Sequence, residues 1–567
     1  MVYRQIETEI DNFINGDIEI SEGYRFSQYK LIKRIMFYAN GIYPKGKTDK
    51  QGNYKYWTDI ISPRIDSEIK NIDFDTKDIM LYSDSEKDYG TILLLNLRLK
   101  EWLRENNKAV ELNDDIEYGS GWGNIVWKKV KGGYERVDLK NFYLTNPTAQ
   151  TLAETAVIER HSMTQSDLRK KEGVWKNVQE VIDDCGNKYF SATPDGIDQK
   201  ETPYYEIFER NGEISEKSLL EAQGKTGGDE NKYILAKIIL AGLSKSRKDK
   251  EKHVLFAEEI PEMPYKEYHR GRYSGRWFRV GIYELLIDIQ TRGNEISNQI
   301  ARGLDWASKT LFRSKDRLLA NNILTDLKNG DVVKSEDLQQ INVRMEGLDQ
   351  LIADWNRLMV LADKLCNSYE VVQGETGPSG TPFRTTSLLN QNANKLFDFL
   401  REKLALALQD VFQDWILPEM MKDLKRKDVL RITGDGELMD RYYKIIVNAW
   451  YIRNLVSLPP HSKDIGEAIK SEKEKELKEK PEQFIKAEKG WLDNVKPRVY
   501  ISITGENVNL QQELDTLATF IGLEQDPIRR TALIEKAMKR KGIDIESLPR
   551  TEQPTAPTVE SLLSAGK

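Results

Sequence analysis

The stretch of sequence that decides the fold is IYELLIDIQTRGNEISNQIARGLDWASKTL, residues 282–311. Its apolar residues recur at steps of three, four or seven, which predicts one continuous apolar seam on a helix of about thirty residues. A helix of this length is far above the mean of roughly eleven to twelve residues. The predicted seam consists of Ile282, Leu286, Ile289, Ile296, Ile300, Leu304, Ala307 and Leu311.

The opposite face of this helix is polar and charged. An amphipathic helix of this kind packs its apolar seam against a partner and turns its other face to water. The polar face consists of Asp288, Arg292, Glu295, Asn298, Arg302 and Asp305.

Two more helical stripes follow, and they predict a second and a third long helix. The connector before the second stripe contains a turn signal, Lys328-Asn-Gly-Asp331, and a Gly/Thr-rich loop, residues 374–384, precedes the third. The pattern therefore predicts two antiparallel helices joined by a small module, then a loop and another long helix. The second stripe is Leu348, Leu351, Trp355, Leu358, Ala362 and Leu365; the third is Leu389, Leu396, Phe399, Leu400, Leu404, Ala407, Leu408, Val411 and Trp415.

The bulk composition describes a long, charge-rich chain. It has 567 residues, 85 basic and 91 acidic, with a net charge of −6, and its length predicts several domains. No run approaches the roughly eighteen apolar residues of a membrane span, and the first residues lack the apolar core of a secretion signal. Cys185 and Cys366 are the two cysteines, so we expect a reducing compartment and no disulfide framework.

The motifs of catalysis and cofactor binding do not appear. Gly119-Ser-Gly-Trp-Gly123 is followed by a strand pattern, whereas a dinucleotide loop needs a helix there. The four histidines are scattered, without partners at metal-ligand spacing. The sequence therefore predicts no catalytic residues, no metal site and no cofactor.

Several short motifs occur in an order that resembles one family. The segment Arg270-Gly-Arg-Tyr-Ser-Gly-Arg276, followed by Asp288-Ile-Gln290 and Asn294, looks like the start of the stem in portal proteins of tailed bacteriophages. The upstream order is similar to the wing of the same family, and the likeness covers roughly residues 20–425. It rests on the upstream segments 119–123, 125–130, 137–143, 146–149, 157–160 and 163–169.

The resemblance implies an α+β fold, mostly α, with a wing, a long-helix stem, a small clip and a helical crown. The parts would follow in this order: wing, 1–263; first stem helix, 264–313; clip, 314–345; second stem helix, 346–373; channel loop, 374–385; long wing helix, 386–424; C-terminal wing or crown, 425–550; and disordered tail, 551–567.

The resemblance also implies a function and its partners. Portal proteins form a ring of about twelve copies at one capsid vertex of the virion, through which double-stranded DNA is packaged and ejected. The partners would be further copies of the chain, the terminase large subunit, the major capsid protein and a tail adaptor or head-completion protein. The ring would assemble in the host cytoplasm, away from membranes, and the terminase would hydrolyse ATP.

Three groups of residues are candidates for this function. In the channel loop, small residues permit close backbone approach to DNA and polar side chains offer donors to phosphates, although an ordinary loop between helices has the same composition. The polar stem face would line a wet channel, and the clip would dock the motor and the tail. The candidates are Thr376, Ser379, Thr381 and Arg384 for the loop, Arg292, Glu295 and Arg302 for the stem, and Arg317, Lys328 and Asp331 for the clip.

A basic and aromatic cluster lies just before the first long helix. Two interpretations are open: stacking and phosphate contacts with nucleic acid, or arginines paired with acids of a neighbouring subunit. The cluster comprises Arg270, Arg272, Arg276 and Arg279 with Tyr268, Tyr273, Trp277 and Phe278.

Two other classes of protein make different predictions. A DNA-processing motor or nuclease would need a Walker loop or clustered acidic metal ligands, which the sequence lacks. A coiled-coil structural adaptor without DNA contact would use the same helical stripes but form a dimer or trimer.

Overall fold

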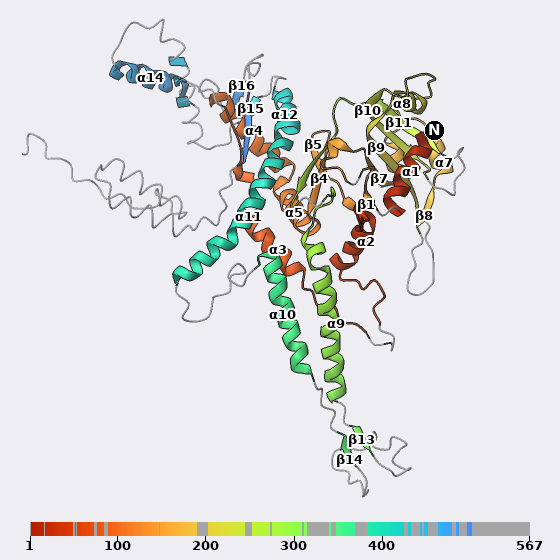
Figure 1. Ribbon diagram of the computed structural model, residues 1–567. Coiled ribbons are helices and arrows are strands. Elements are labelled where there is room, and N and C mark those ends of the chain that lie inside the picture. Colours follow the sequence, from red (N-terminus) through yellow and green to blue (C-terminus); the bar gives the residue numbers. More distant parts are fainter. Residues whose placement is uncertain are drawn as a thin grey trace, which may run out of the picture. The chain divides into compact units, whose positions relative to one another are not determined.

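The computed structural model shows an α+β fold in which helix predominates (Figure 1). It describes residues 2–308, 311–313, 339–341, 347–368, 383–424 and short segments between 429 and 501, apart from gaps at 16–17, 49–51, 53, 73–75, 84–88, 147, 190–201, 244–251 and 273–274. The chain divides into two compact units, Met1–Ile503 and Thr504–Lys567, and all described residues belong to the first.

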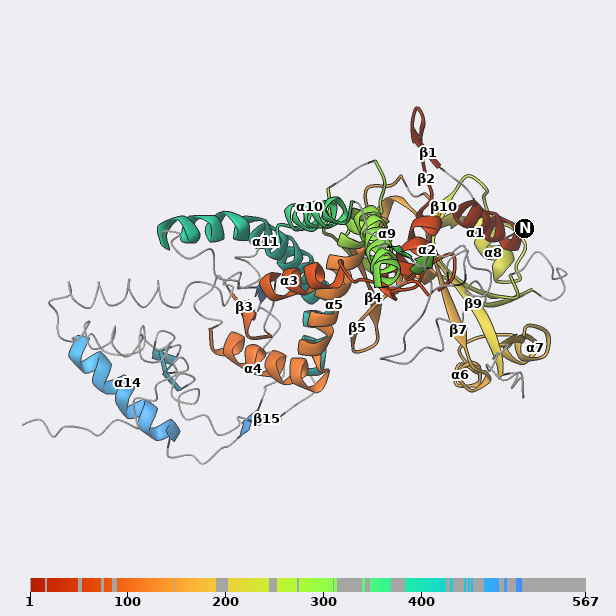
Figure 2. The ribbon, with the colours of Figure 1, turned by 90° about the horizontal axis from the view of Figure 1, so that it is seen from below.

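The first two long helices pack side by side as a hairpin. Helix α9 spans Ile282–Ser308, with 27 residues, and α10 spans Leu348–Cys366, with 19. The two lie next to each other in both ribbon views (Figure 1, Figure 2). Residues of α3 (Ser62–Ile72) and the segment before it join their core. The shared core contains Ile60, Ile61, Ile65, Ile282, Leu286, Ile289, Ile296, Leu358, Ala362 and Cys366.

The ends of the predicted seams differ from expectation. Leu304 is 51% exposed because the part of α9 beyond Ile300 extends past the buried core, and Leu365 is 42% exposed because it lies to the side of the α10 contact face. Helix α9 ends at Ser308, so Leu311 lies on a strand rather than on the helix. The side chain of Ala307 lies outside the described residues.

Two short strands connect the hairpin to the module between its helices. β13 (Leu311–Arg313) pairs antiparallel with β14 (Gln339–Ile341). The chain therefore leaves α9 and returns toward α10 on neighbouring strands. Most of the predicted clip, 314–345, lies outside the described residues.

The third long helix is interrupted by a π-helical turn. Helix α11 (Phe383–Val411) continues through the π-helix Phe412–Ile416 into α12 (Leu417–Leu424). Phe399 is 54% exposed, whereas the sequence placed it in the seam; Phe397 is buried instead. The α11 helix contacts α3, β12 (Tyr265–His269) and β17 (Arg498–Ile501), and its core also includes residues of α4 (Tyr89–Glu105). The buried side runs through Leu400, Leu404, Leu408, Val411, Phe412 and Trp415.

A six-stranded antiparallel sheet forms much of the N-terminal part. Its order is β11-β10-β9-β7-β6, with β8 paired to β9. Figure 2 shows α1 and α8 on one side of this sheet and α6 and α7 on the other. The elements are α1 (Val2–Asn15), β6 (Phe142–Leu144), β7 (Val157–Met163), α6 (Gln165–Arg169), α7 (Val178–Asp184), β8 (Asn187–Tyr189), β9 (Thr202–Ser215), α8 (Glu216–Ala222), β10 (Tyr233–Ala241) and β11 (His253–Glu259).

Alternation along β10 explains the two covered faces. Ile238 and Leu240 belong to the core under α1 and α8, while Ile239 and Ala241 belong to the core under α6 and α7. Successive side chains of a strand point to opposite faces, so a strand covered on both sides is apolar throughout.

A smaller sheet lies between this region and the long helices. Its order is β12-β4-β5, formed by Tyr265–His269, Asn124–Val130 and Gly133–Arg136. Helix α5 (Lys108–Trp122) runs directly into β4. The other elements are β1 (Ile18–Ser21), β2 (Tyr24–Phe26), α2 (Gln28–Ala39), β3 (Ile79–Tyr82), β15 (Val429–Arg431), α14 (Lys463–Lys478), β16 (Phe484–Lys486) and β17 (Arg498–Ile501), which pairs with β3.

Candidate functional site: the α9–α10 hairpin and its surroundings

Three amide side chains on α9 bind the backbone of a distant extended segment. Gln290, Asn294 and Asn298 stand four residues apart, on one side of the helix, and all three are buried. Their side-chain oxygens accept hydrogen bonds from the backbone amides of Ile60 (2.8 Å), Thr58 (3.0 Å) and Tyr56 (2.8 Å), respectively. We refer to Gln290, Asn294 and Asn298 as the amide ladder.

The ladder works because two repeat distances match. Four residues of α-helix rise about 6.0 Å, and two residues of an extended segment rise about 6.4–6.8 Å. Alternate backbone amides therefore meet successive amide side chains as the segment runs antiparallel to α9. The Asn298 side chain also donates to the Tyr56 carbonyl at 3.0 Å, and Gln290 donates to the Thr58 carbonyl at 2.5 Å.

The polar face of α9 is thus partly used within the chain. Asn298 was predicted to face water, but it is 7% exposed because the 56–60 segment covers it. Arg292 lies 3.4 Å from Glu295 and 3.3 Å from Asp354 of α10, so it links the two helices. Glu295 and Arg302 lie at a cleft between α9 and the segment around Tyr43.

The basic and aromatic cluster has its partners inside the same chain. The Arg270 side chain is 8% exposed and donates through two nitrogens to Glu68, each at 2.6 Å. Arg276 is buried and binds both carboxylate oxygens of Glu284 at 2.7 and 2.8 Å. Both open interpretations are therefore wrong for these two arginines, because acids of α3 and α9 were available within the fold.

The aromatic members of that cluster belong to the protein core. Trp277 and Phe278 are fully buried and Tyr268 is 5% exposed. Arg279 is also buried, whereas Arg272 is exposed, and Tyr273 lies outside the described residues. A buried ring cannot stack on a nucleic acid base, so these rings stabilise the junction between the small sheet and α9.

The glycine-rich motif at 119–123 forms a close backbone crossing. Gly123 has φ +88° and ends α5 just before β4. A Cβ atom at Gly281 would lie 2.3 Å from the Gly121 carbonyl oxygen, and one at Gly121 would lie 2.5 Å from the Tyr283 ring. The glycines are required by this packing at the start of α9, which agrees with the prediction that the motif is not a dinucleotide loop.

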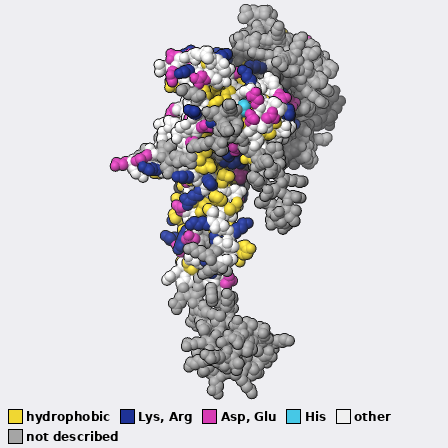
Figure 3. All heavy atoms as spheres, turned by 90° about the vertical axis from the view of Figure 1, so that its right-hand side faces the viewer, with side chains coloured by type: hydrophobic (Ala, Val, Ile, Leu, Met, Phe, Trp, Pro, Cys, Tyr) yellow, Lys and Arg dark blue, Asp and Glu magenta, His cyan; other side chains and the backbone are white. Residues whose placement is uncertain are grey.

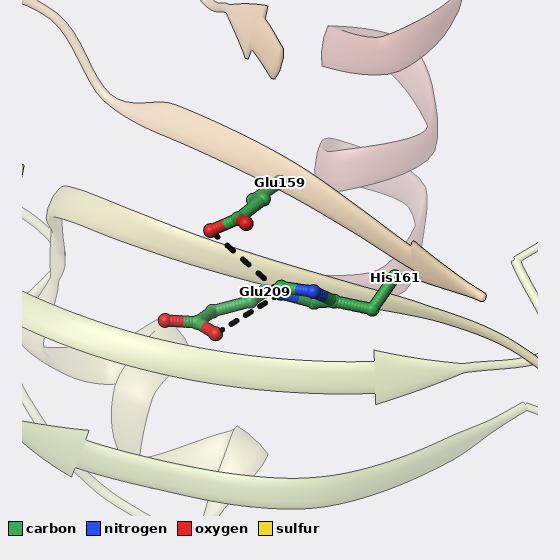
Figure 4. A group of neighbouring side chains, drawn as sticks. All are labelled: Glu159, His161 and Glu209. Carbon is green, nitrogen blue, oxygen red and sulfur yellow. Dashed lines mark hydrogen bonds and ion pairs between the residues drawn. The ribbon is translucent and has the colours of Figure 1, made fainter. Parts of the chain in front are cut away.

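One group in the described part of the chain has a geometry suited to a metal ion. Figure 4 shows Glu159 and His161 from β7 and Glu209 from β9, turned toward one another. The His161 Nε2 atom lies 3.3 Å from Glu209 and 3.7 Å from Glu159. Sequence reasoning missed this group, because the two strands meet only in the folded sheet.

Lys128 explains this acidic group without a metal. Its Nζ atom, reaching from β4, lies 2.6 Å from Glu159 and 2.8 Å from Glu209, and Lys237 lies 2.8 Å from the other Glu209 oxygen. Burial disfavours the charged carboxylate, but a hydrogen bond from His161 and the two ammonium groups outweigh it and lower the pKa of Glu209. Two carboxylates and two ammonium groups balance, so we assign the group to ion pairing between the two sheets.

Helix α10 carries apolar residues on nearly every side. Leu358, Ala362 and Cys366 are buried against α9 and α3. At about 100° per residue, Val360 points almost opposite to that face. The exposed fractions are 42% for Ile352, 53% for Val360, 42% for Leu361 and 42% for Leu365. Figure 3 shows one face of the molecule, on which apolar side chains lie at the surface among charged ones along the described part of the hairpin.

Several predicted residues lie outside the described part of the chain. They are Thr376, Ser379 and Thr381 of the loop and Arg317, Lys328 and Asp331 of the clip. Arg384 lies in the first turn of α11, because that helix begins at Phe383, and not in the loop as predicted. Its side chain is not among those described.

Comparison with protein-family models finds no match, and comparison with curated proteins finds none either. In the described residues, no helix combines the length and hydropathy that crossing a membrane requires.

Proposed function

We propose that this chain is a portal protein, a ring-forming channel subunit for double-stranded DNA at one vertex of a phage capsid. The observation that carries the proposal is the surface of α10. Outside its contact face with α9 and α3, α10 exposes four apolar side chains among charged ones, and exposed apolar groups of this kind gain stability when a partner covers them. Among the residues that the structure describes, α9 and the region of α3 cover one side of α10, which favours packing of its other apolar side chains against a further copy of the hairpin.

The organisation of the hairpin supports the same proposal. The chain leaves α9 and returns to α10 on two paired strands, an arrangement expected for a stem that carries a clip. The order of short motifs in the sequence adds the family resemblance. In this proposal Arg292, Glu295 and Arg302 lie near the channel side of the stem, and residues 374–385 contact DNA.

Docking of the terminase, the capsid protein and the tail belongs to this proposal. We propose that residues 314–345 contact the motor and the tail adaptor at the outer end of the ring. The terminase supplies ATP hydrolysis, and the portal supplies the channel. The proposed location is the virion, after assembly of the ring in the host cytoplasm.

Native mass spectrometry with negative-stain electron microscopy of the same sample tests the proposal. We expect rings of about twelve copies with a central hole. A discrete dimer or trimer of elongated shape would instead support a coiled-coil structural adaptor. A monomer at every salt and protein concentration would contradict the proposed self-association.

A matched pair of variants tests whether α10 forms the interface. Val360→Asp with Leu361→Asp places two charges on the exposed apolar side of α10, and we expect the ring to dissociate. Val110→Asp with Val174→Asp also introduces two charges, at positions that are 62% and 68% exposed and lie away from α10, and we expect the ring to persist. Dissociation by the control alone would contradict the role given to α10.

A further inference from the structure

A cleft of about 380 Å³ lies between α9 and residues 43–45, 55 and 57. Tyr38 of α2 adds to one wall, and Asn294, Asn298 and Gln299 of α9 add to another. The volume falls within the roughly 300–1,000 Å³ of small-molecule sites. The amide ladder binds residues 56–60, so it fixes the backbone on both sides of Trp57, which lines the cleft.

One wall of the cleft is aromatic. Trp57 makes edge contacts with Tyr38, at a ring separation of 5.6 Å, and with Tyr43, at 5.2 Å. The Tyr43 hydroxyl donates to the Tyr56 carbonyl at 2.6 Å and accepts from Asn298 at 3.1 Å. These contacts hold the rings in place before a ligand arrives, and a planar aromatic ligand gains affinity from such a surface.

The remaining walls contain both cations and an acid. Lys45, Lys55 and Arg302 line the cleft, against one acid, Glu295, which is itself 3.4 Å from Arg292. The Lys55 ammonium lies 5.1 Å from the centre of the Tyr43 ring and donates to the Gly46 carbonyl. Cations next to an aromatic wall suit a ligand that has both an anionic group and a flat ring.

We propose that this cleft binds a nucleotide, with the base against the wall formed by Tyr43 and Trp57 and the phosphate near Lys45 and Arg302. A bare anion would leave the aromatic wall unused, and an uncharged ring would leave the cations unused. A free nucleotide and a nucleotide within a single DNA strand present the same groups. The inference is independent of the proposed portal function, because every group in it comes from one chain.

The experiment measures binding to the purified, nuclease-treated full-length protein in its native assembly. AMP, adenosine and inorganic phosphate are titrated by calorimetry, and a short fluorescein-labelled single-stranded oligonucleotide by anisotropy. We expect AMP to bind about tenfold or more tightly than adenosine or inorganic phosphate, because AMP contacts both the aromatic and the basic wall. Competition between AMP and the oligonucleotide would identify a strand as a source of the nucleotide; binding of AMP alone would identify the free nucleotide.

Variants locate the site. We expect Lys45→Ala combined with Arg302→Gln to weaken AMP binding by about tenfold or more, through the loss of two phosphate contacts. Lys47→Ala removes an exposed lysine of the same segment that does not line the cleft, and should leave AMP binding unchanged. Trp57→Leu should weaken the binding of adenosine and of AMP to a similar extent.

Two results would overturn the inference: no binding of AMP or oligonucleotide up to about millimolar concentration, or equal AMP affinity in the wild type and the Lys45/Arg302 variant. Ring formation is recorded on the same samples. Rings that bind no nucleotide would contradict the proposed nucleotide site alone. Nucleotide binding without rings would contradict the portal proposal alone.

Discussion

The substitution Asn294→Leu tests the middle rung of the amide ladder. It keeps the branched shape and the number of heavy atoms of the side chain but removes the oxygen that accepts from the Thr58 amide at 3.0 Å and from Gln290 at 3.1 Å. Gln290 keeps its bond to the Thr58 carbonyl, so the main cost is one amide donor left without its acceptor. Such a loss costs about 1–3 kcal/mol.

The expected effect is local rather than global. A cost of about 2 kcal/mol raises the fraction of molecules in which residues 56–60 have left α9 by roughly 30-fold. Amide hydrogen exchange, followed by mass spectrometry on peptides that cover residues 54–62, measures this opening. Exchange should accelerate there by that factor, while peptides of the six-stranded sheet exchange as in the wild type.

A control on the same helix separates the ladder from a general effect of leucine. Gln299 is exposed on α9, so Gln299→Leu should leave exchange at residues 54–62 unchanged. Unchanged exchange in Asn294→Leu would refute the argument that the ladder holds the segment. Equal acceleration in both variants would attribute the effect to the helix as a whole.

Two further predictions concern buried charges. Glu68→Gln leaves Arg270 buried without its carboxylate and should lower the free energy of unfolding, measured by urea titration, by about 3–5 kcal/mol. Glu68→Leu combined with Arg270→Met should recover most of that loss. A loss below about 0.5 kcal/mol in Glu68→Gln would contradict this prediction. Burial raises the pKa of Asp115 to about 6, above its unfolded value, because it outweighs the contacts of the carboxylate with Trp127 and Arg136. Between about pH 4 and pH 6 the folded state therefore binds more protons than the unfolded state, and the contribution of Asp115 to stability falls as the pH rises. Relative to the wild type, Asp115→Asn should therefore gain about 2–3 kcal/mol between pH 4 and pH 7 in the same titration, and a pH-independent difference would show that the carboxyl group titrates normally.

The three long helices were predictable because the signal for them is local. Apolar residues at a period near 3.6 define a seam without reference to the rest of the chain, and the seam around Leu286 and Ile289 is buried as predicted. The same pattern could not fix where a seam stops being covered. Leu304 and Phe399 fit the period but are exposed, because burial depends on which elements reach them.

The partners of polar residues were not predictable, because they come from distant parts of the chain. Asn298 looks like a surface residue in its helical pattern, but the backbone that buries it is more than two hundred residues away. Glu68 and Arg270 are similarly distant. For Arg276 a signal existed, since Glu284 follows eight residues later in the first turn of α9.

The sequence by itself determined the helical framework and the lack of familiar catalytic motifs, because periodicity and spacing act over a few residues. Tertiary structure alone decided that the amides of α9 bind residues 56–60, that Lys128 neutralises Glu159 and Glu209, and that a cleft forms beside Trp57. Each of these depends on groups brought together from separate elements, and whether a polar group is buried and paired is settled by that assembly.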